Sequence, residues 1–444
     1  MQDISTDQQK GGKGNMAVTR RQFVAGLGAL AATMGFNPAQ IAKITEAVAY
    51  GPPFTGKPKV LWVHGAECTG CSVSLLSLFE DVNGEALMGT GTTTLDALGL
   101  VTDPNDVPRT LHEAGFNVDG NGAVVNIADV LVDFLDLQYH ETVMGMGGDL
   151  AYKFLREQMD NAQDGEPFVL VVEGATQDTT LKGAWNDDST HPWCSVGMSD
   201  NGVDELAFDD VVGLLAGKPN CAAVLSIGQC ASFGGYPAAV PPAFKGLGDN
   251  GGRQTGAKST YDYLVSKGMP TAAGKVVNVP GCPPNPWWFV LTVVAWLVDF
   301  NQTARTAGAV GPLGILEATG TGPLDVTFAA GAVDKTRRLN AVYGIPLHGP
   351  ACPRYAAYVK GEFASKPGDA GCLQLIGCKA PSTNSLCGTH GWNNQQPENR
   401  GAIDTYNVAD LNGIRGGNCI MGGHPCMACT EKGYPDSFVP FVLR

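Results

Sequence analysis

Four short apolar runs of one design recur along the chain, at residues 59–64, 168–172, 223–227 and 275–279. Each run is rich in β-branched residues, and Gly or Pro follows within two positions. Continuous apolar runs, as opposed to alternating ones, predict strands that are buried on both faces, as in a parallel sheet. The chain should therefore contain an α/β domain.

Helical stretches separate these runs, at residues 72–79, 149–161 and 261–267. Alternation of strand and helix predicts right-handed crossovers and a doubly wound sheet. Ligands of such sheets bind outside the carboxyl ends of the strands. Three of the four runs lead into cysteine there, so thiols far apart in sequence should converge on one edge of the sheet.

Other parts of the chain lack this pattern. Residues 84–125 and 177–210 are polar and are interpreted as insertions, the second as a surface excursion that includes Asp209 and Asp210. From about Pro312 onward Gly, Pro, Asn and Cys dominate. A domain whose core is largely inorganic has this composition, because metal ligation replaces apolar burial.

Composition and charge disfavour some classes of function and favour others. The 444 residues carry a formal charge of −14, and residues 1–49 hold five basic and three acidic side chains, so the remainder carries about −16. This balance disfavours a nucleic-acid partner, because phosphate binding needs a basic surface. The 59 glycines indicate many close backbone approaches, as wrapped cofactors require.

The N-terminus is interpreted as an export signal. Arg20 and Arg21 precede an apolar stretch at residues 25–36, and an A-x-A site ends at Ala49. The paired arginines match the twin-arginine signals of exported, already folded proteins. The alternative is an ordinary basic N-terminal helix.

No membrane span is expected in the mature chain. The most apolar later segment, residues 287–300, contains Asp299 and is shorter than the roughly 20 residues needed to cross a bilayer. We interpret it as a buried helix.

The first group of cysteines is Cys68, Cys71, Cys230 and Cys282. A lone CxxC pair is weak evidence for an iron–sulfur cluster, because it also fits a thioredoxin-like redox site or half of a zinc site. With two more cysteines at equivalent strand ends it becomes a four-thiol set that suits a [4Fe–4S] cluster. The alternative is that Cys230 and Cys282 are inert buried thiols.

The second group lies in the last hundred residues. It comprises His348, Cys352, Cys372, Cys378, Cys387, Cys419, Cys426 and Cys429. Seven thiols and an imidazole, which can replace thiolate at such sites, suffice for two further clusters. A disulfide framework is the chief alternative, but short CxxC pairs bridge badly and a chain of this size does not need staples.

These residues resemble the small subunit of a nickel–iron uptake hydrogenase over nearly everything after residue 57. In the first part the resemblance rests on ECTGCS at 67–72, YHET at 139–142, VEG at 172–174, GQCASFGG at 228–235 and PGCPPN at 280–285. In the second part it rests on CPR at 352–354, GC at 371–372, GCK at 377–379 and GHPC at 423–426.

The resemblance implies an electron-transfer subunit in a heterodimer, with the nickel–iron centre in a large partner subunit. It divides the chain into a signal peptide (1–49), a flavodoxin-like domain (57–305) and a C-terminal iron–sulfur domain (312–444). The implied clusters are a proximal [4Fe–4S] on Cys68, Cys71, Cys230 and Cys282, a distal [4Fe–4S] on His348, Cys352, Cys372 and Cys378, and a medial one on Cys387, Cys426 and Cys429. Glu67 is either an aid to proton transfer or a carboxylate that accepts loop amides.

Three positions depart from the family's pattern. His348 and Cys352 are spaced H-x-x-x-C where the family has H-x-x-C. Cys419 stands where the family usually has a proline, whose absence of a thiolate leaves the medial cluster with three irons. If Cys419 is a ligand, the medial cluster is a [4Fe–4S] cluster, as we expect; otherwise it is a [3Fe–4S] cluster. Gln229 replaces the usual threonine before Cys230, and nothing in the sequence accounts for it.

Two cysteines are left over. Cys194 and Cys221 are expected to be unligated, the second as a small core residue. Between Cys68 and Cys71 there is no extra cysteine, which argues against the six-cysteine proximal cluster of oxygen-tolerant relatives.

Two rival functions stay open. One is the cluster-bearing subunit of a quinone reductase, although such relatives typically have adjacent cysteines and the sequence has no Cys-Cys pair. The other is a stand-alone ferredoxin-like carrier. For the leading function, a periplasmic hydrogen:acceptor oxidoreductase, the acceptor would be a c-type cytochrome steered by acidic charge or a membrane cytochrome b.

Overall fold

The computed structural model describes residues 59–76, 136–160, 168–180, 192–198, 205–240, 256–286, 288–289, 292–293, 333–393 and 418–443. The expected export signal at residues 1–49 and the insertion at 84–125 lie outside the described residues, as does most of the segment 287–300. Trp288, Phe289 and Val293 of that segment are buried.

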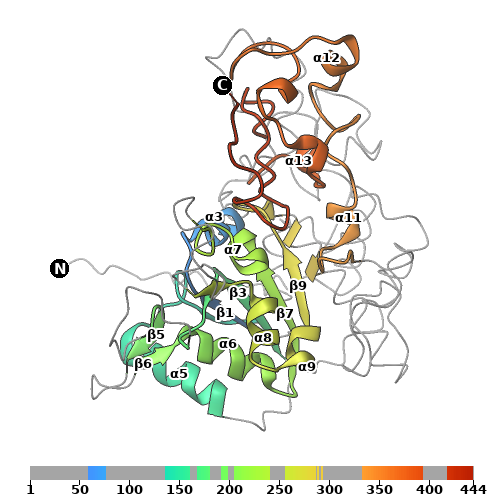
Figure 1. Ribbon diagram of the computed structural model, residues 1–444. Coiled ribbons are helices and arrows are strands. Elements are labelled where there is room, and N and C mark those ends of the chain that lie inside the picture. Colours follow the sequence, from blue (N-terminus) through green and yellow to red (C-terminus); the bar gives the residue numbers. More distant parts are fainter. Residues whose placement is uncertain are drawn as a thin grey trace, which may run out of the picture.

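A five-stranded parallel sheet forms the first part of the molecule (Figure 1). Its order is β2-β1-β3-β7-β9, and every neighbouring pair is parallel. The strands are β1 (Lys59–His64), β2 (Asp136–His140), β3 (Phe168–Glu173), β7 (Cys221–Ile227) and β9 (Val276–Val279). All four predicted strands form, and β3 and β9 are buried along their whole length. The prediction of a parallel α/β sheet is confirmed.

Helices cover the sheet and occupy its carboxyl edge. The covering helices are α5 (Gly148–Asp160), α6 (Phe208–Gly217), α8 (Thr260–Ser266) and α9 (Pro270–Gly274). Leu155 of α5, Leu215 of α6 and Leu264 of α8 join alternate strand residues such as Leu61 and Leu170 in one buried cluster. Two short helices lie on the side that faces the C-terminal part: α3 (Gly70–Leu76), which follows β1 after a loop at residues 65–69, and α7 (Gly228–Phe233), which begins directly after β7 (Figure 1).

The interpretation of residues 177–210 as a surface excursion is wrong for residues 206–209, which are buried. The segment contains β4 (Thr176–Gln177), the antiparallel pair β5 (Ser195–Met198) and β6 (Glu205–Ala207), and the start of α6. Asp209 is buried because its carboxylate accepts hydrogen bonds from the Thr179 amide, at 3.1 Å, and from the Thr179 hydroxyl, at 2.9 Å. Two adjacent aspartates suggest a solvated loop, yet one of them holds a turn against the core.

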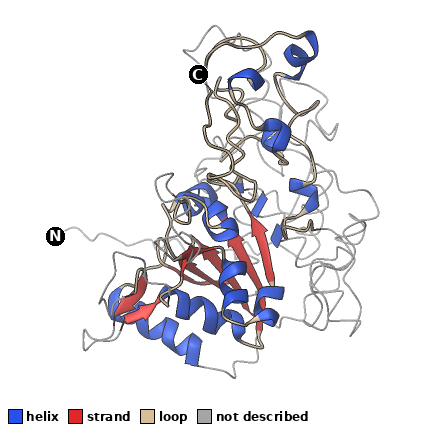
Figure 2. Ribbon diagram, in the orientation of Figure 1, coloured by secondary structure: helices blue, strands red, loops and turns tan. Residues whose placement is uncertain are grey.

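The C-terminal part is built mostly from turns (Figure 2). Its short helical elements are α11 (Asn340–Tyr343), α12 (Tyr355–Lys360), η3 (Gln374–Ile376), η4 (Ala380–Ser382) and α13 (Cys387–His390). Its small apolar cluster includes Leu347, Leu373 and Ile420, and cysteines complete that cluster. Among the described residues, no helix has both the length and the apolar character to cross a membrane.

Candidate metal centres

Four thiols converge at the carboxyl edge of the sheet, as predicted. Cys68 and Cys71 lie at the start of α3, Cys230 lies on α7, and Cys282 follows β9. The pKa of Cys71 is raised well above its ordinary value by burial, by Glu173 and by the neighbouring thiols of the other three cysteines. Burial, Cys282 and Cys68 raise the pKa of Cys230 to about 12. We call these four residues the first thiol group.

The backbone approaches the thiols of this group closely. Gly228 has a φ of +82°, and a Cβ atom added there would lie 2.3 Å from the Cys71 Sγ atom. Gly235 has a φ of +51°, and its added Cβ would lie 2.8 Å from the Cys230 Sγ atom. Only glycine fits at these positions. Four thiols on closely approaching backbone fit a [4Fe–4S] cluster, whose positive irons would deprotonate them.

The loop of the first thiol group is held by Glu173 at the end of β3. One carboxylate oxygen accepts the backbone amides of Cys71 and Ser72, each at 3.1 Å. The other accepts the Ser72 hydroxyl at 2.6 Å and the Trp62 indole N–H at 3.1 Å. Burial raises the pKa of Glu173, and the hydrogen bond from the Ser72 hydroxyl opposes the rise. Glu173 thus takes the role of accepting loop amides that was one expectation for Glu67.

Glu67 instead faces a histidine. Its Oε1 atom lies 3.3 Å from His64 Nδ1 and accepts the Thr69 hydroxyl at 3.1 Å, while its buried Oε2 atom has no partner among the described residues. Burial alone would lower the pKa of His64, but Glu67, Glu173 and Glu141 raise it. The side-chain ligand atoms of His64, Glu67 and Glu173 lie within 4.8 Å of one another. Because Glu173 already accepts four hydrogen bonds, we describe this trio as an ion-pair network and not as a metal site.

A second thiol group lies in the C-terminal part, closest to the sheet. It comprises Cys387, Cys419, Cys426 and Cys429. The pKa of Cys429 is raised well above its ordinary value by burial and by the thiols of the other three. Burial and Cys419 raise the pKa of Cys387 to about 12, against the opposing hydrogen bond from Ser385. Cys419 therefore lies within electrostatic reach of the expected medial ligands.

A third thiol group comprises Cys352, Cys372 and Cys378. Burial and the two other thiols raise the pKa of Cys352, while the Arg354 amide and guanidinium oppose the rise. Arg354 is itself buried, and its side chain donates to the carbonyl oxygens of Asp369 and Gly371, each at 2.7 Å. This arginine thus holds the backbone segment that leads into Cys372.

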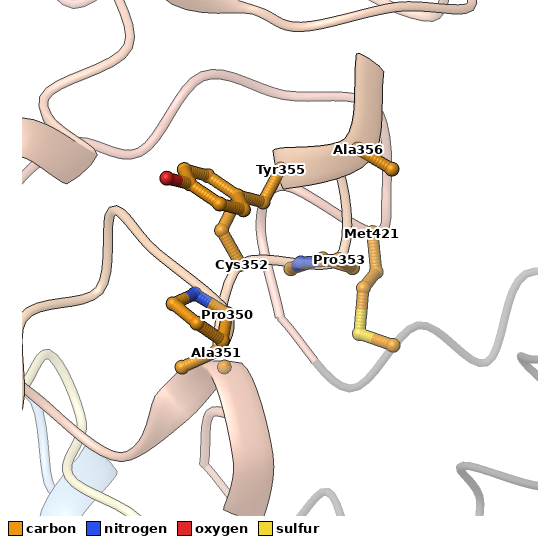
Figure 3. A pocket seen from close by; sticks show the side chains of 8 residues that line it. Pro350, Ala351, Cys352, Pro353, Tyr355, Ala356 and Met421 are labelled. Atoms are coloured by element: carbon orange, nitrogen blue, oxygen red, sulfur yellow. The ribbon is translucent and has the colours of Figure 1, made fainter. Parts of the chain in front are cut away.

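His348 joins this group only through its place in the chain, four residues before Cys352. Its ring contacts Tyr358 edge-on, with 4.6 Å between ring centroids, and Tyr355, with 5.6 Å. A cavity of about 380 Å³ opens beside Cys352 (Figure 3). Gly388 and Met421, which follow Cys387 and Cys419, line it too, so it lies between the second and third groups.

The three groups follow one another along the molecule. The thiol of Cys282, in the first group, contributes to the raised pKa of Cys429 in the second. In turn, the Cys426 amide donates to the Cys378 Sγ atom of the third group at 3.2 Å. The groups are therefore ordered from the sheet edge outward.

The two remaining cysteines lie outside these groups. Cys221 is buried at the start of β7, and its thiol donates to the Ala223 carbonyl oxygen at 3.5 Å. Burial raises the pKa of Cys194 to about 11, with smaller contributions from Glu141 and Glu67. That both are unligated stays a prediction.

Two known families match this chain, one in the sheet part and one in the C-terminal part. Residues 343–442 match the family described as the C-terminal part of the NiFe/NiFeSe hydrogenase small subunit. Residues 121–296 match the family described as NADH ubiquinone oxidoreductase, 20 Kd subunit. The two matches fall on the C-terminal part and on the sheet part.

Similar proteins extend over nearly the whole chain. The periplasmic [NiFeSe] hydrogenase small subunit of Desulfomicrobium baculatum is 27% identical over 436 residues, which are 96% of this chain and 99% of that protein. The periplasmic [NiFe] hydrogenase small subunit 1 of Nitratidesulfovibrio vulgaris is 27% identical over 431 residues, covering 96% and 93%.

Solved structures give the same result for the fold. The crystal structure of a reduced, active form of the Ni-Fe-Se hydrogenase from Desulfomicrobium baculatum matches with a TM-score of 0.54 at 26% identity, over 87% of this chain and 99% of that chain. An actinobacterial-type NiFe-hydrogenase from Ralstonia eutropha H16 matches with a TM-score of 0.55 at 21% identity, over 88% and 83%, which shows the shared fold alone.

Proposed function

Because this chain is a homologue of hydrogenase small subunits, we propose that it is the electron-transfer subunit of a hydrogen:acceptor oxidoreductase. A large partner subunit would hold the nickel–iron centre and split hydrogen. The observation that carries the proposal is the arrangement of eleven of the thirteen cysteines in three successive groups that start at the sheet edge.

Each thiol group would hold one iron–sulfur cluster. The first thiol group is the proposed proximal [4Fe–4S] site, and the third, completed by His348, is the proposed distal [4Fe–4S] site. The second thiol group is the proposed medial site, with Cys387, Cys426 and Cys429 as ligands and Cys419 as the fourth. When bound, such clusters would supply one-electron redox chemistry at each step.

Side chains of this chain position the segments that carry the proposed cluster ligands. Glu173 fixes the loop that carries Cys68 and Cys71, and Arg354 fixes the segment that leads into Cys372. One carboxylate oxygen of Glu67 contacts His64 and the other has no partner in the described part, which supports a role in passing a proton. We retain that role for it.

The iron count of the medial site is tested by electron paramagnetic resonance of the oxidised complex. With Cys419 as a ligand we expect no strong three-iron signal, and Cys419→Pro, which restores the family's usual residue, should create one. A strong three-iron signal from the unmodified protein would contradict a four-iron medial cluster.

We further propose a flavodoxin-like domain at residues 57–305 and an iron–sulfur domain at residues 312–444. The observed strand order, second-first-third-fourth-fifth along the chain, is the order of flavodoxin-like sheets. The cysteines packed into the C-terminal apolar cluster support the second domain.

We propose export to the periplasm by the twin-arginine route, from Arg20 and Arg21. Names of similar proteins that include the word periplasmic support the compartment. Replacing both arginines by lysine should leave the protein and its partner in the cytoplasm.

The electron acceptor is proposed to be a c-type cytochrome or a membrane cytochrome b. Exposed side chains beside the third thiol group include Tyr358 and Val359, flanked by Lys360 and Glu362. This mixture does not support steering by a strongly acidic surface. Hydrogen-to-cytochrome rates that fall steeply with salt would favour steering, and flat rates would favour apolar docking.

Purification of the native complex tests the function itself. We expect nickel in a co-purified large subunit and hydrogen oxidation with an external acceptor. A stable monomer without a nickel-containing partner would favour the ferredoxin-like carrier. The match of residues 121–296 to a quinone-reductase subunit keeps that second candidate in view, and quinone reduction without hydrogen oxidation would favour it.

A further inference from the structure

Gln229 lies at the meeting point of three ligand-bearing segments. It directly precedes Cys230, and its backbone amide donates to the Gly281 carbonyl oxygen, next to Cys282, at 2.8 Å. Its side-chain amide donates to the Glu431 carbonyl oxygen at 2.9 Å, two residues beyond Cys429. The side chain thus spans from the first thiol group to the second.

The far end of this hydrogen bond is rigidly held. The Glu431 carboxylate pairs with Arg338 at 3.0 Å and accepts the Asn384 amide at 2.6 Å. Arg338 also donates to the Thr430 carbonyl oxygen at 2.8 Å. The acceptor therefore belongs to a network of hydrogen bonds and an ion pair that includes the buried residues Arg338 and Thr430.

Gln229 is 1% exposed, and its Oε1 atom has no partner among the described residues. A buried amide that leaves one oxygen unsatisfied is costly, so packing alone does not explain glutamine here. Threonine, which the resemblance would place at this position, is too short to span the same gap. The donated hydrogen bond across the boundary is the gain that the structure offers.

We propose that Gln229 is a positioning residue that ties the segment bearing Cys230 to the segment bearing Cys429, and so fixes the spacing between the first and second thiol groups. Electron transfer between two centres falls steeply with their separation, so a tie at this point affects the rate without touching either metal. The functional half of this inference rests on the proposed function; the tie itself does not.

The test compares two variants of the whole complex. Gln229→Met keeps the length of the side chain, removes the donor and removes the unsatisfied oxygen, so it should fold. The matched control is Tyr236→Phe, which removes another hydrogen bond across the same boundary, the one donated by Tyr434 at 2.8 Å. Both variants lose one hydrogen bond across this boundary, but only the first loses the one made by the residue directly adjacent to Cys230.

Hydrogen exchange measures the tie. Gln229→Met should speed exchange of the amides at residues 430–432 about fivefold, the effect of one lost hydrogen bond on local opening. Electron paramagnetic resonance of the reduced complex measures the spacing, and the magnetic interaction between first-group and second-group centres should weaken in Gln229→Met and not in Tyr236→Phe.

Unchanged exchange at residues 430–432 in Gln229→Met would overturn the tie. Faster exchange with an unchanged magnetic interaction, or an equal loss of interaction in Tyr236→Phe, would overturn its role in spacing. If the unmodified complex holds no cluster in the second group, the proposed function fails there, and the exchange experiment still decides whether the tie exists.

Discussion

Glu173 is the single side chain on which the first thiol group depends most. It is 1% exposed and accepts four hydrogen bonds. In Glu173→Gln the new amide would face the Trp62 indole N–H, donor against donor. We expect the free energy of unfolding to fall by about 1–3 kcal/mol and the iron content of the proximal site to drop.

Urea unfolding and iron analysis of the purified complex check this expectation. Asp160→Asn is the matched control, because Asp160 is two-thirds exposed and, among the residues that the structure describes, its ion pair is with Arg156 on the surface of α5. That change should stay within about 0.5 kcal/mol. Equal effects of the two substitutions would contradict the role given to Glu173.

Asp178 gives the chain a defined pH dependence. Burial alone would raise its pKa, but Lys258 and Lys267, each at 2.8 Å, and Thr180 bind the carboxylate and lower the pKa well below its usual range. A depressed carboxyl pKa stabilises the fold above the unfolded-state value of about 4, and the effect is lost as pH falls below it.

The stability difference between the unmodified chain and Asp178→Asn should therefore shrink by roughly 1 kcal/mol between pH 6 and pH 3. Urea unfolding midpoints at the two pH values measure it. A difference that stays constant with pH would show that the two lysines do not hold the carboxylate ionised.

At the residue scale, the sequence predicted the cysteines of the sheet edge but not the side chain that holds their loop in place. Cysteines at strand ends are a local pattern, and the structure brings together all four that were expected at the sheet edge. Glu173 stands at the same kind of strand end, directly after a buried run, but one carboxylate there has many explanations. Its role depends on partners 101 to 111 positions away in the sequence, which no local pattern contains.

At the scale of elements, two adjacent leucines of α6 allow the contribution of burial to stability to be measured apart from the contribution of helix propensity. Leu215 is fully buried against the sheet, and the adjacent Leu214 is half exposed. Leu215→Ala should cost about 2–5 kcal/mol of unfolding free energy, and Leu214→Ala less than about 1 kcal/mol. Thermal or urea unfolding of the two variants checks this, and similar losses would mean that α6 does not pack as described.

The same helix shows why elements were missed. The runs that form β1, β3, β7 and β9 are continuous and apolar, so the sequence predicts them. The paired aspartates at the start of α6 suggested a surface loop, because Thr179, the partner that buries Asp209, is distant in sequence. Strand β2 has only two buried residues of five, and its polar pattern gave no strand signal.

At the scale of the whole molecule, the order of the three thiol groups is the main result. The sequence predicted which cysteines belong together through a family resemblance, and the structure adds that Cys282 lies near Cys429 and Cys378 near Cys426. The contact of Cys282 with Cys429 joins two parts of the chain that are more than a hundred residues apart, and sequence spacing does not contain it. It comes from docking of the C-terminal part on the carboxyl edge of the sheet (Figure 1).

The most direct test of this account is the iron and sulfide content of the small chain, measured on the native complex after anaerobic purification. Three four-iron clusters predict about twelve irons and about twelve sulfides in this chain, counted after the iron of the partner's nickel–iron centre is subtracted. About eleven irons, with a three-iron signal, would revise the role of Cys419 alone. About four irons or fewer would contradict the central claim that the three thiol groups form one electron-transfer chain.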